Sequence, residues 1–95
     1  MAVDIAGSNP IVVSGTTTTN DAVLEPGMGV FIKFVKWHSP DTIGHKANLQ
    51  TGTGHLICKF ECEVADESQY APVWSSSVDI YCNDLDSGEL HIYIR

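Results

Sequence analysis

The clearest pattern along the chain is an alternation of apolar and polar residues with a period of two. Apolar side chains occupy every second position from Leu56 to Cys62, and similar alternation runs through 78–82 and 90–95. A period of two places successive side chains on opposite faces of a β-strand. The pattern therefore predicts that six residues are buried together: Leu56, Cys58, Phe60, Ile80, Ile92 and Ile94.

The segment Gly29–His38 differs, because apolar residues fill both of its alternating sets. A strand that is apolar on both faces is typical of the middle of a sheet. It is predicted to end at Ser39-Pro40-Asp41. Shorter extended segments are expected at 11–13, 22–24 and 47–50, and an edge strand is expected to begin at Val73.

Turn residues separate these segments. Glu25-Pro26-Gly27 is a turn signal, and Thr51-Gly52-Thr53-Gly54 is typical of a hairpin connection. Asp86-Ser87-Gly88 is predicted to be a tight hairpin turn with Gly88 in the left-handed conformation. The polar segment 65–72 is expected to form the longest loop.

About seven short strands without helical periodicity predict an all-β fold. We expect a small antiparallel β-sandwich, either jelly-roll or Ig-like. The 95 residues fit one domain. Residues 1–9 are predicted to form an extended N-terminal arm, and residues 10–95 a single β-sandwich domain.

Charge and hydropathy exclude several classes of function. The formal net charge is −7, and the five basic residues form no run, which argues against nucleic acid as a partner. No stretch approaches the roughly 20 apolar residues that a membrane helix needs. The N-terminus lacks the basic region of a secretory signal. We therefore expect a soluble chain with neither nucleic acid nor membrane as its partner.

The three cysteines are expected to be reduced. Cys58 and Cys62 in one strand would lie roughly 13 Å apart, too far for a disulfide. A bond from Cys82 to either of them is left open by the sequence. We predict that Cys58 and Cys62 are inert, buried thiols, which favours assembly in a reducing compartment.

The sequence shows no motif that predicts catalysis or cofactor binding. The four histidines lack the short spacings of zinc sites, and the segment 83–89 fails the EF-hand pattern in the position of its glycine. Neither a G-x-S-x-G elbow nor a phosphate loop is present. We therefore expect no enzyme, no catalytic residue, no cofactor and no metal.

Aromatic side chains are the remaining candidates for a functional site. Tryptophan and tyrosine at exposed positions occur in protein interfaces and in carbohydrate platforms. The aromatic candidates, several of which are expected at outward or loop positions, are Trp37, Tyr70, Trp74, Tyr81 and Tyr93. Burial of Trp37 and Trp74 at the two ends of the core is the alternative.

Three segments together resemble small virion proteins of tailed bacteriophages. They are VVSGTTTTNDAVLEPGMGVFIKFVKWHSP, GTGHLICKF and the ending LDSGELHIYIR. The resemblance covers about residues 11–95. It implies a β-sandwich that decorates or cements a capsid, assembled in the bacterial host cytoplasm and located on the capsid surface of the virion. It carries over no functional residue.

The sequence therefore predicts a non-enzymatic structural virion protein that acts through multivalent protein–protein contacts. Its partner would be the major capsid protein or another virion protein, and a homo-oligomer is expected. A carbohydrate- or host-receptor-binding β-sandwich module is the alternative. Strand augmentation by the N-terminal segment and aromatic anchors are the expected contacts. The interface candidates are Ile11, Val12, Val13, Trp37, Tyr70 and Trp74.

Overall fold

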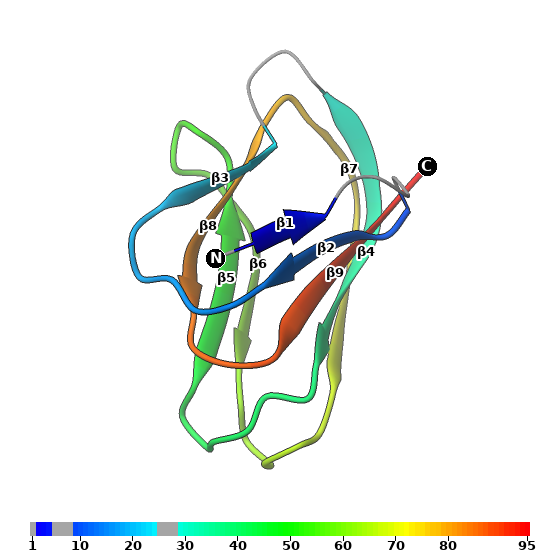
Figure 1. The fold of residues 1–95 in the computed structure, drawn as a ribbon. Coiled ribbons are helices and arrows are strands. Elements are labelled where there is room, and N and C mark those ends of the chain that lie inside the picture. The colour runs from blue at the N-terminus through cyan, green and yellow to red at the C-terminus, as the bar shows by residue number, and fades with distance from the viewer. Residues whose placement is uncertain (1, 5–8, 25–28) are drawn as a thin grey trace.

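The computed structural model describes residues 2–4, 9–24 and 29–95, which form nine antiparallel strands in two packed sheets (Figure 1). The first sheet has the order β1 (Ala2–Asp4), β2 (Ile11–Ser14), β9 (Glu89–Ile94), β4 (Val30–His38) and β7 (Gln69–Ser77). The second has the order β3 (Asp21–Leu24), β8 (Ile80–Leu85), β5 (Lys46–Gln50) and β6 (Leu56–Glu61). Within these ranges no helix is long and apolar enough to cross a membrane.

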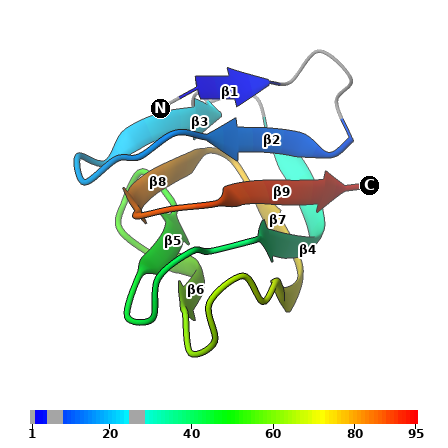
Figure 2. The ribbon, with the colours of Figure 1, turned by 60° about the horizontal axis from the view of Figure 1, so that its bottom comes forward.

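The strand pairing is that of a jelly roll. β2 pairs with β9, β3 with β8, β4 with β7, and β5 with β6, so the chain from β2 to β9 is one long antiparallel ribbon. Additional pairing of β9 with β4 and of β8 with β5 rolls this ribbon into two sheets (Figure 2). The predicted all-β sandwich is confirmed, and the strand order selects a jelly roll.

The space between the sheets is filled by the inward-facing residues of both. Trp37 of β4 is fully buried, and its ring centroid lies 5.9 Å from that of Phe60 on the facing sheet. The predicted burial of Cys58, Phe60, Ile80 and Ile92 is confirmed. These residues alternate with outward-facing ones, as a strand with one buried face requires.

Of the other two predicted core residues, Leu56 lies outside the core, whereas Ile94 packs against it. Leu56 is 63% exposed, so its prediction is wrong, and Ile94 is half-buried. The cause at Leu56 is an irregular register, in which Leu49 pairs with Cys58 but Gln50 pairs with Leu56. The intervening residue, Ile57, packs against the core instead. A bulge exchanges the two faces of a strand, which strict alternation cannot anticipate.

The two predicted irregular segments are partly strands. Ala2–Asp4, within the expected arm, forms β1, which pairs with β2, and Val3 packs against the core. Residues 1 and 5–8 of that arm, and the expected turn at 25–27, lie outside the described residues. The expected loop 65–72 is shorter, because β7 begins at Gln69. The residues of β7 from Gln69 to Trp74 alternate between half-buried and exposed, as expected for an edge strand that packs on one side only.

The predicted hairpin at 51–54 is confirmed, because it joins the paired strands β5 and β6. The predicted hairpin at 86–88 is wrong, because the strands that this turn joins, β8 and β9, lie in different sheets and do not pair. The turn instead carries the chain from one sheet to the other. Gly88 has a φ of 71°, in the left-handed region that favours glycine.

We predict that all three thiols resist modification in the native protein. None is in a disulfide, and Cys58, Cys62 and Cys82 are 6%, 1% and 0% exposed. Burial raises the pKa of Cys58 to about 12 and that of Cys82 to about 11, so little thiolate forms at neutral pH. Thiol titration should show less than one reactive group per chain without denaturant and three groups in denaturant. Rapid modification of two or more thiols in the native protein would contradict the burial of the cysteine side chains between the sheets.

Candidate binding surface

The outer surface of the five-stranded sheet carries five aromatic side chains from three adjacent strands. We call this set the aromatic face, and it consists of Phe31 and Phe34 of β4, Tyr70 and Trp74 of β7, and Tyr93 of β9. Tyr70 and Trp74 are 57% and 59% exposed, which is unusual for such large rings in a small domain.

The rings contact one another across the strands. Phe34 stacks on Tyr93 with a centroid separation of 4.4 Å and lies 5.0 Å from Tyr70 on its other side. Phe31 lies 6.4 Å from Trp74. These separations are those of favourable aromatic pairs, so the rings hold one another in place on the sheet. The aromatic face is therefore already formed in the chain without a partner.

A bulge in β4 places the two phenylalanines on this side. Ile32 pairs with Ile94 and Phe34 with Tyr93, so Lys33 is an extra residue in β4. Ile32 is buried before this extra residue, and Val35 and Trp37 are buried after it, so the buried positions shift from even to odd numbers. The extra residue lets both Phe31 and Phe34 point away from the core.

The same irregularity shapes the edge strand. Between the pairs Ile32–Ser75 and Phe34–Pro72, two residues of β7 face one residue of β4. One of these two is Trp74, whose φ of 50° is left-handed and rare for a bulky side chain. Such strain is held only where the surrounding structure enforces it, and it often accompanies a functional surface.

The exposed edge of β7 is a poor template for strand addition. Pro72 cannot donate a backbone hydrogen bond, and the bulge next to it breaks the regular edge. Side chains on the face of the sheet, rather than backbone groups at its edge, are thus the groups that β7 offers to a partner.

The structure separates the six interface candidates into two groups. Tyr70 and Trp74 lie on the aromatic face. Trp37 is fully buried and cannot anchor a partner, because it fills the core between the sheets. The segment Ile11–Val13 is also unsuited to strand augmentation, because its backbone already pairs with β1 on one side and β9 on the other. Ile11 and Val13 are buried, and Val12 is half-buried.

Three members of the aromatic face were not among the predicted interface residues: Phe31, Phe34 and Tyr93. The signal that could have identified Phe34 is Lys36, since residues two apart share one face of a strand and a lysine prefers water. Because both alternating sets of residues 29–38 are apolar, the sequence predicts a central strand and does not separate Phe31 and Phe34 from the core residues. Tyr93 was recognised as an aromatic candidate, but its neighbours across the strands were unknown.

Two histidines extend the aromatic face toward the ends of β4 and β9. The rings of His38 and His91 lie 3.9 Å apart, and Nε2 of His91 lies 3.4 Å from Glu89. Burial, followed by the neighbouring His91 and Lys36, lowers the pKa of His38 below its usual value. The neutral form of His38 is therefore favoured.

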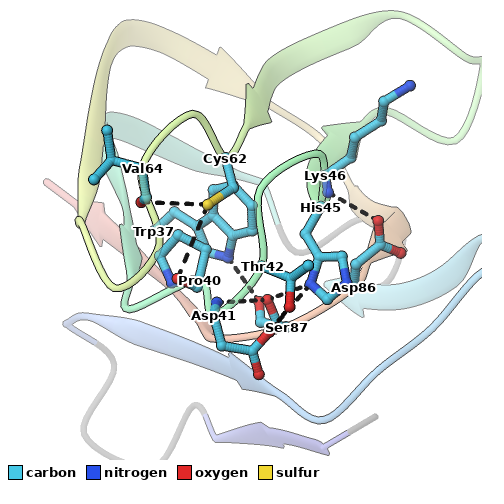
Figure 3. Close-up of polar contacts among 10 residues, drawn as sticks. All are labelled: Trp37, Pro40, Asp41, Thr42, His45, Lys46, Cys62, Val64, Asp86 and Ser87. Carbon is cyan, nitrogen blue, oxygen red and sulfur yellow. Dashed lines mark hydrogen bonds and ion pairs between the residues drawn. The ribbon is translucent and has the colours of Figure 1, made fainter.

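A serine, a histidine and an aspartate meet at one end of the sandwich, and we call Asp41, His45 and Ser87 the Ser87 cluster (Figure 3). Oγ of Ser87 lies 2.8 Å from Nδ1 of His45, and Oδ1 of Asp41 lies 3.3 Å from the same nitrogen. In a catalytic triad the carboxylate and the hydroxyl occupy opposite nitrogens of the ring. This arrangement therefore differs from that of a nucleophilic site.

The Ser87 cluster instead connects two loops. Ser87 Oγ accepts a hydrogen bond from the backbone N–H of Asp41, and the Ser87 carbonyl accepts one of 2.8 Å from Trp37 Nε1. Ser87 is only 9% exposed. The cluster holds the segment 39–45 against the turn between β8 and β9.

A hollow of about 350 Å³ lies beside β8 and is lined by residues 16–19, Asp21, Leu85 and Asp86. Asp21 accepts hydrogen bonds from the hydroxyls of Thr17 and Thr19, which lower its pKa. In the part of the chain that the structure describes, no three His, Cys, Asp or Glu side chains are grouped to hold a metal.

Asp84 and Asp86 are neighbouring carboxyl groups next to this hollow. Burial, the hydrogen bond with Asp86 and its negative charge raise the pKa of Asp84 to about 6. Although burial opposes it, the pKa of Asp86 is lowered by its hydrogen bonds with Asp84 and with the backbone N–H of Lys46. As the pH falls, Asp84 therefore takes up a proton before Asp86 does.

We predict that Asp84→Asn stabilises the protein at pH 7.5 more than at pH 4.5. The pKa of Asp84 is higher in the folded state than its ordinary 3.8, so its stabilising contribution is present below that value and is lost as pH rises through 6. The asparagine removes this loss. Urea unfolding of both proteins at the two pH values measures the effect. Glu67→Gln, which removes an exposed negative charge, is the control. If Glu67→Gln changed the stability at the two pH values as much as Asp84→Asn does, the raised pKa of Asp84 would not be the cause.

Comparison of the chain with protein-family models, with curated proteins and with solved structures finds no match.

Proposed function

We propose that the chain is a non-enzymatic structural virion protein that binds its partner through the aromatic face. The partner would be the major capsid protein or another virion protein, and the protein would decorate or cement a bacteriophage capsid, after assembly in the host cytoplasm. The observation that carries the proposal is the exposure of Tyr70 and Trp74 on a pre-built aromatic surface. Aromatic anchors of this kind dominate the binding energy of many protein interfaces.

The mode of attachment follows from the shape of this surface. One side of the sandwich carries the aromatic side chains, and single contacts can be weak because a capsid presents many equivalent sites. Self-association into a homo-oligomer would link several copies and raise their effective concentration on the lattice. The jelly-roll architecture occurs among viral capsid and lectin domains, which supports the proposal by fold analogy only.

Co-sedimentation with capsid particles lacking this protein tests the proposal. We expect the wild-type chain to bind and the double variant Tyr70→Ala/Trp74→Ala to bind at least about tenfold more weakly, since anchors of this type contribute 1.4 kcal/mol or more. Leu56→Ala removes an equally exposed apolar side chain from the other sheet and should bind normally. Equal binding by all three proteins would exclude the aromatic face, and no binding by any would exclude the capsid as partner.

A carbohydrate- or host-receptor-binding module is the second candidate. It is favoured by the stacked rings of Phe34 and Tyr93 beside the exposed Tyr70, since sugars pack on such rings. Binding to a glycan array, without binding to capsids, would select this alternative.

A further inference from the structure

The strands that carry the aromatic face contain few acidic residues. The strands β4 and β9, together with Arg95 at the end of β9, contain three of the five basic residues of the chain: Lys33, Lys36 and Arg95. One of its twelve acidic residues, Glu89, falls within β4, β7 or β9, and β7 has no charged residue. The aromatic face is therefore the basic region of a protein whose net charge is −7.

Two of these cations are placed among the aromatic rings. Lys36 lies between the buried residues Val35 and Trp37, so its side chain is on the outer side of the sheet. Its neighbours across the strands are Tyr70 and His91. The guanidinium carbon of Arg95 lies 5.2 Å from the ring centroid of Phe31, within the range of a cation–π contact.

We infer that the aromatic face recognises an acidic protein surface, whose carboxylates would lie opposite Lys36 and Arg95. This inference rests on the proposed function and specifies the chemistry of its partner. Complementary charges steer association and select the partner, while the aromatic rings supply the apolar contact area. A strongly acidic chain would be repelled from such a partner everywhere except at this face, so the orientation of binding is defined as well.

Other occupants fit the face less well. Symmetric pairing of two copies through this face would bring Lys36 and Arg95 close to identical charges. Nucleic acid requires a larger cluster of basic residues than two or three. An acidic protein surface complements the positive charges of Lys36 and Arg95 and also offers contact area to the aromatic side chains.

The test uses charge reversal with a matched control on the opposite sheet. Lys36→Glu and Arg95→Glu should each weaken binding to capsid particles at least tenfold, whereas Lys59→Glu, the same change on β6, should stay within twofold of wild type. Lys36→Gln should give a smaller loss than Lys36→Glu. Wild-type binding should weaken between 50 and 300 mM salt, because exposed charges are screened. Circular dichroism confirms that each variant is folded.

The outcomes separate the inference from the function on which it rests. If Tyr70→Ala/Trp74→Ala abolishes capsid binding but the charge reversals leave it unchanged, the acidic-surface inference is overturned and the proposed function stands. If no protein binds capsids, the proposed function fails, and titration with poly-L-glutamate followed by NMR decides the inference. Shifts of the amides of Lys36 and Tyr70 would support it. Shifts elsewhere, no shifts, or binding of dextran sulfate alone would overturn it.

Discussion

Replacing Trp37 by alanine is expected to destabilise the domain by about 3–5 kcal/mol, the usual cost of truncating a buried tryptophan. Trp37 is fully buried, packs against Phe60 on the opposite sheet, and donates a hydrogen bond of 2.8 Å to the carbonyl of Ser87. The alanine leaves a cavity between the sheets and an unpaired buried carbonyl, and both are unfavourable. For a domain of this size the loss is a large part of the total stability.

Denaturant unfolding of three variants separates these contributions. Trp37→Phe retains most of the volume but loses the hydrogen bond, so we expect a loss of about 1–3 kcal/mol. Trp74→Ala is the matched control, because this tryptophan is 59% exposed, and its effect on stability should be within about 1 kcal/mol. A similar loss of stability for Trp37→Ala and Trp74→Ala would contradict the assignment of core and surface.

Gly88→Ala is expected to destabilise the domain by roughly 2–5 kcal/mol. Its φ of 71° disfavours any residue with a Cβ atom by about 1–2 kcal/mol. The added Cβ would also overlap the carbonyl oxygen of His38 and approach Trp37 Nε1 to 3.1 Å. The turn between β8 and β9 must therefore shift away from the end of β4, which weakens the hydrogen bond between Trp37 and Ser87.

Gly54→Ala is the control for the backbone conformation alone. Gly54 has a φ of 90°, but a Cβ there would meet nothing within 4 Å. Its cost should be about 1–2 kcal/mol, and the difference between the two variants measures the contact with β4. Thermal unfolding resolves this difference, since 1 kcal/mol shifts the midpoint by about 4–8 °C for a domain of this size. Equal midpoints for the two variants would show that close packing at Gly88 has no energetic effect.

The candidate site could be predicted in part, and the limit was the bulge in β4. Strict alternation places Phe31 with Val35 and Trp37 on one face of that strand, and Phe34 on the other. The extra residue Lys33 changes the phase, so Phe31 and Phe34 both leave the core. A bulge has no simple sequence signal, because it depends on the register of both neighbouring strands. The sequence does predict Tyr70 and Trp74 as interface residues, because they are aromatic and lie at expected outward or loop positions.

The sequence by itself determined the all-β class, most of the strands, the hairpin at 51–54, the left-handed turn at Gly88 and the buried positions of Cys58, Phe60, Ile80 and Ile92. These features depend on local periodicity and turn chemistry, which a single strand or turn already contains. Only the tertiary structure decided the strand order of the jelly roll, the pairing of β1 with β2 and the assembly of the aromatic face. Those depend on contacts between residues far apart in the chain, such as Phe34 with Tyr70 and Tyr93, which no local pattern specifies.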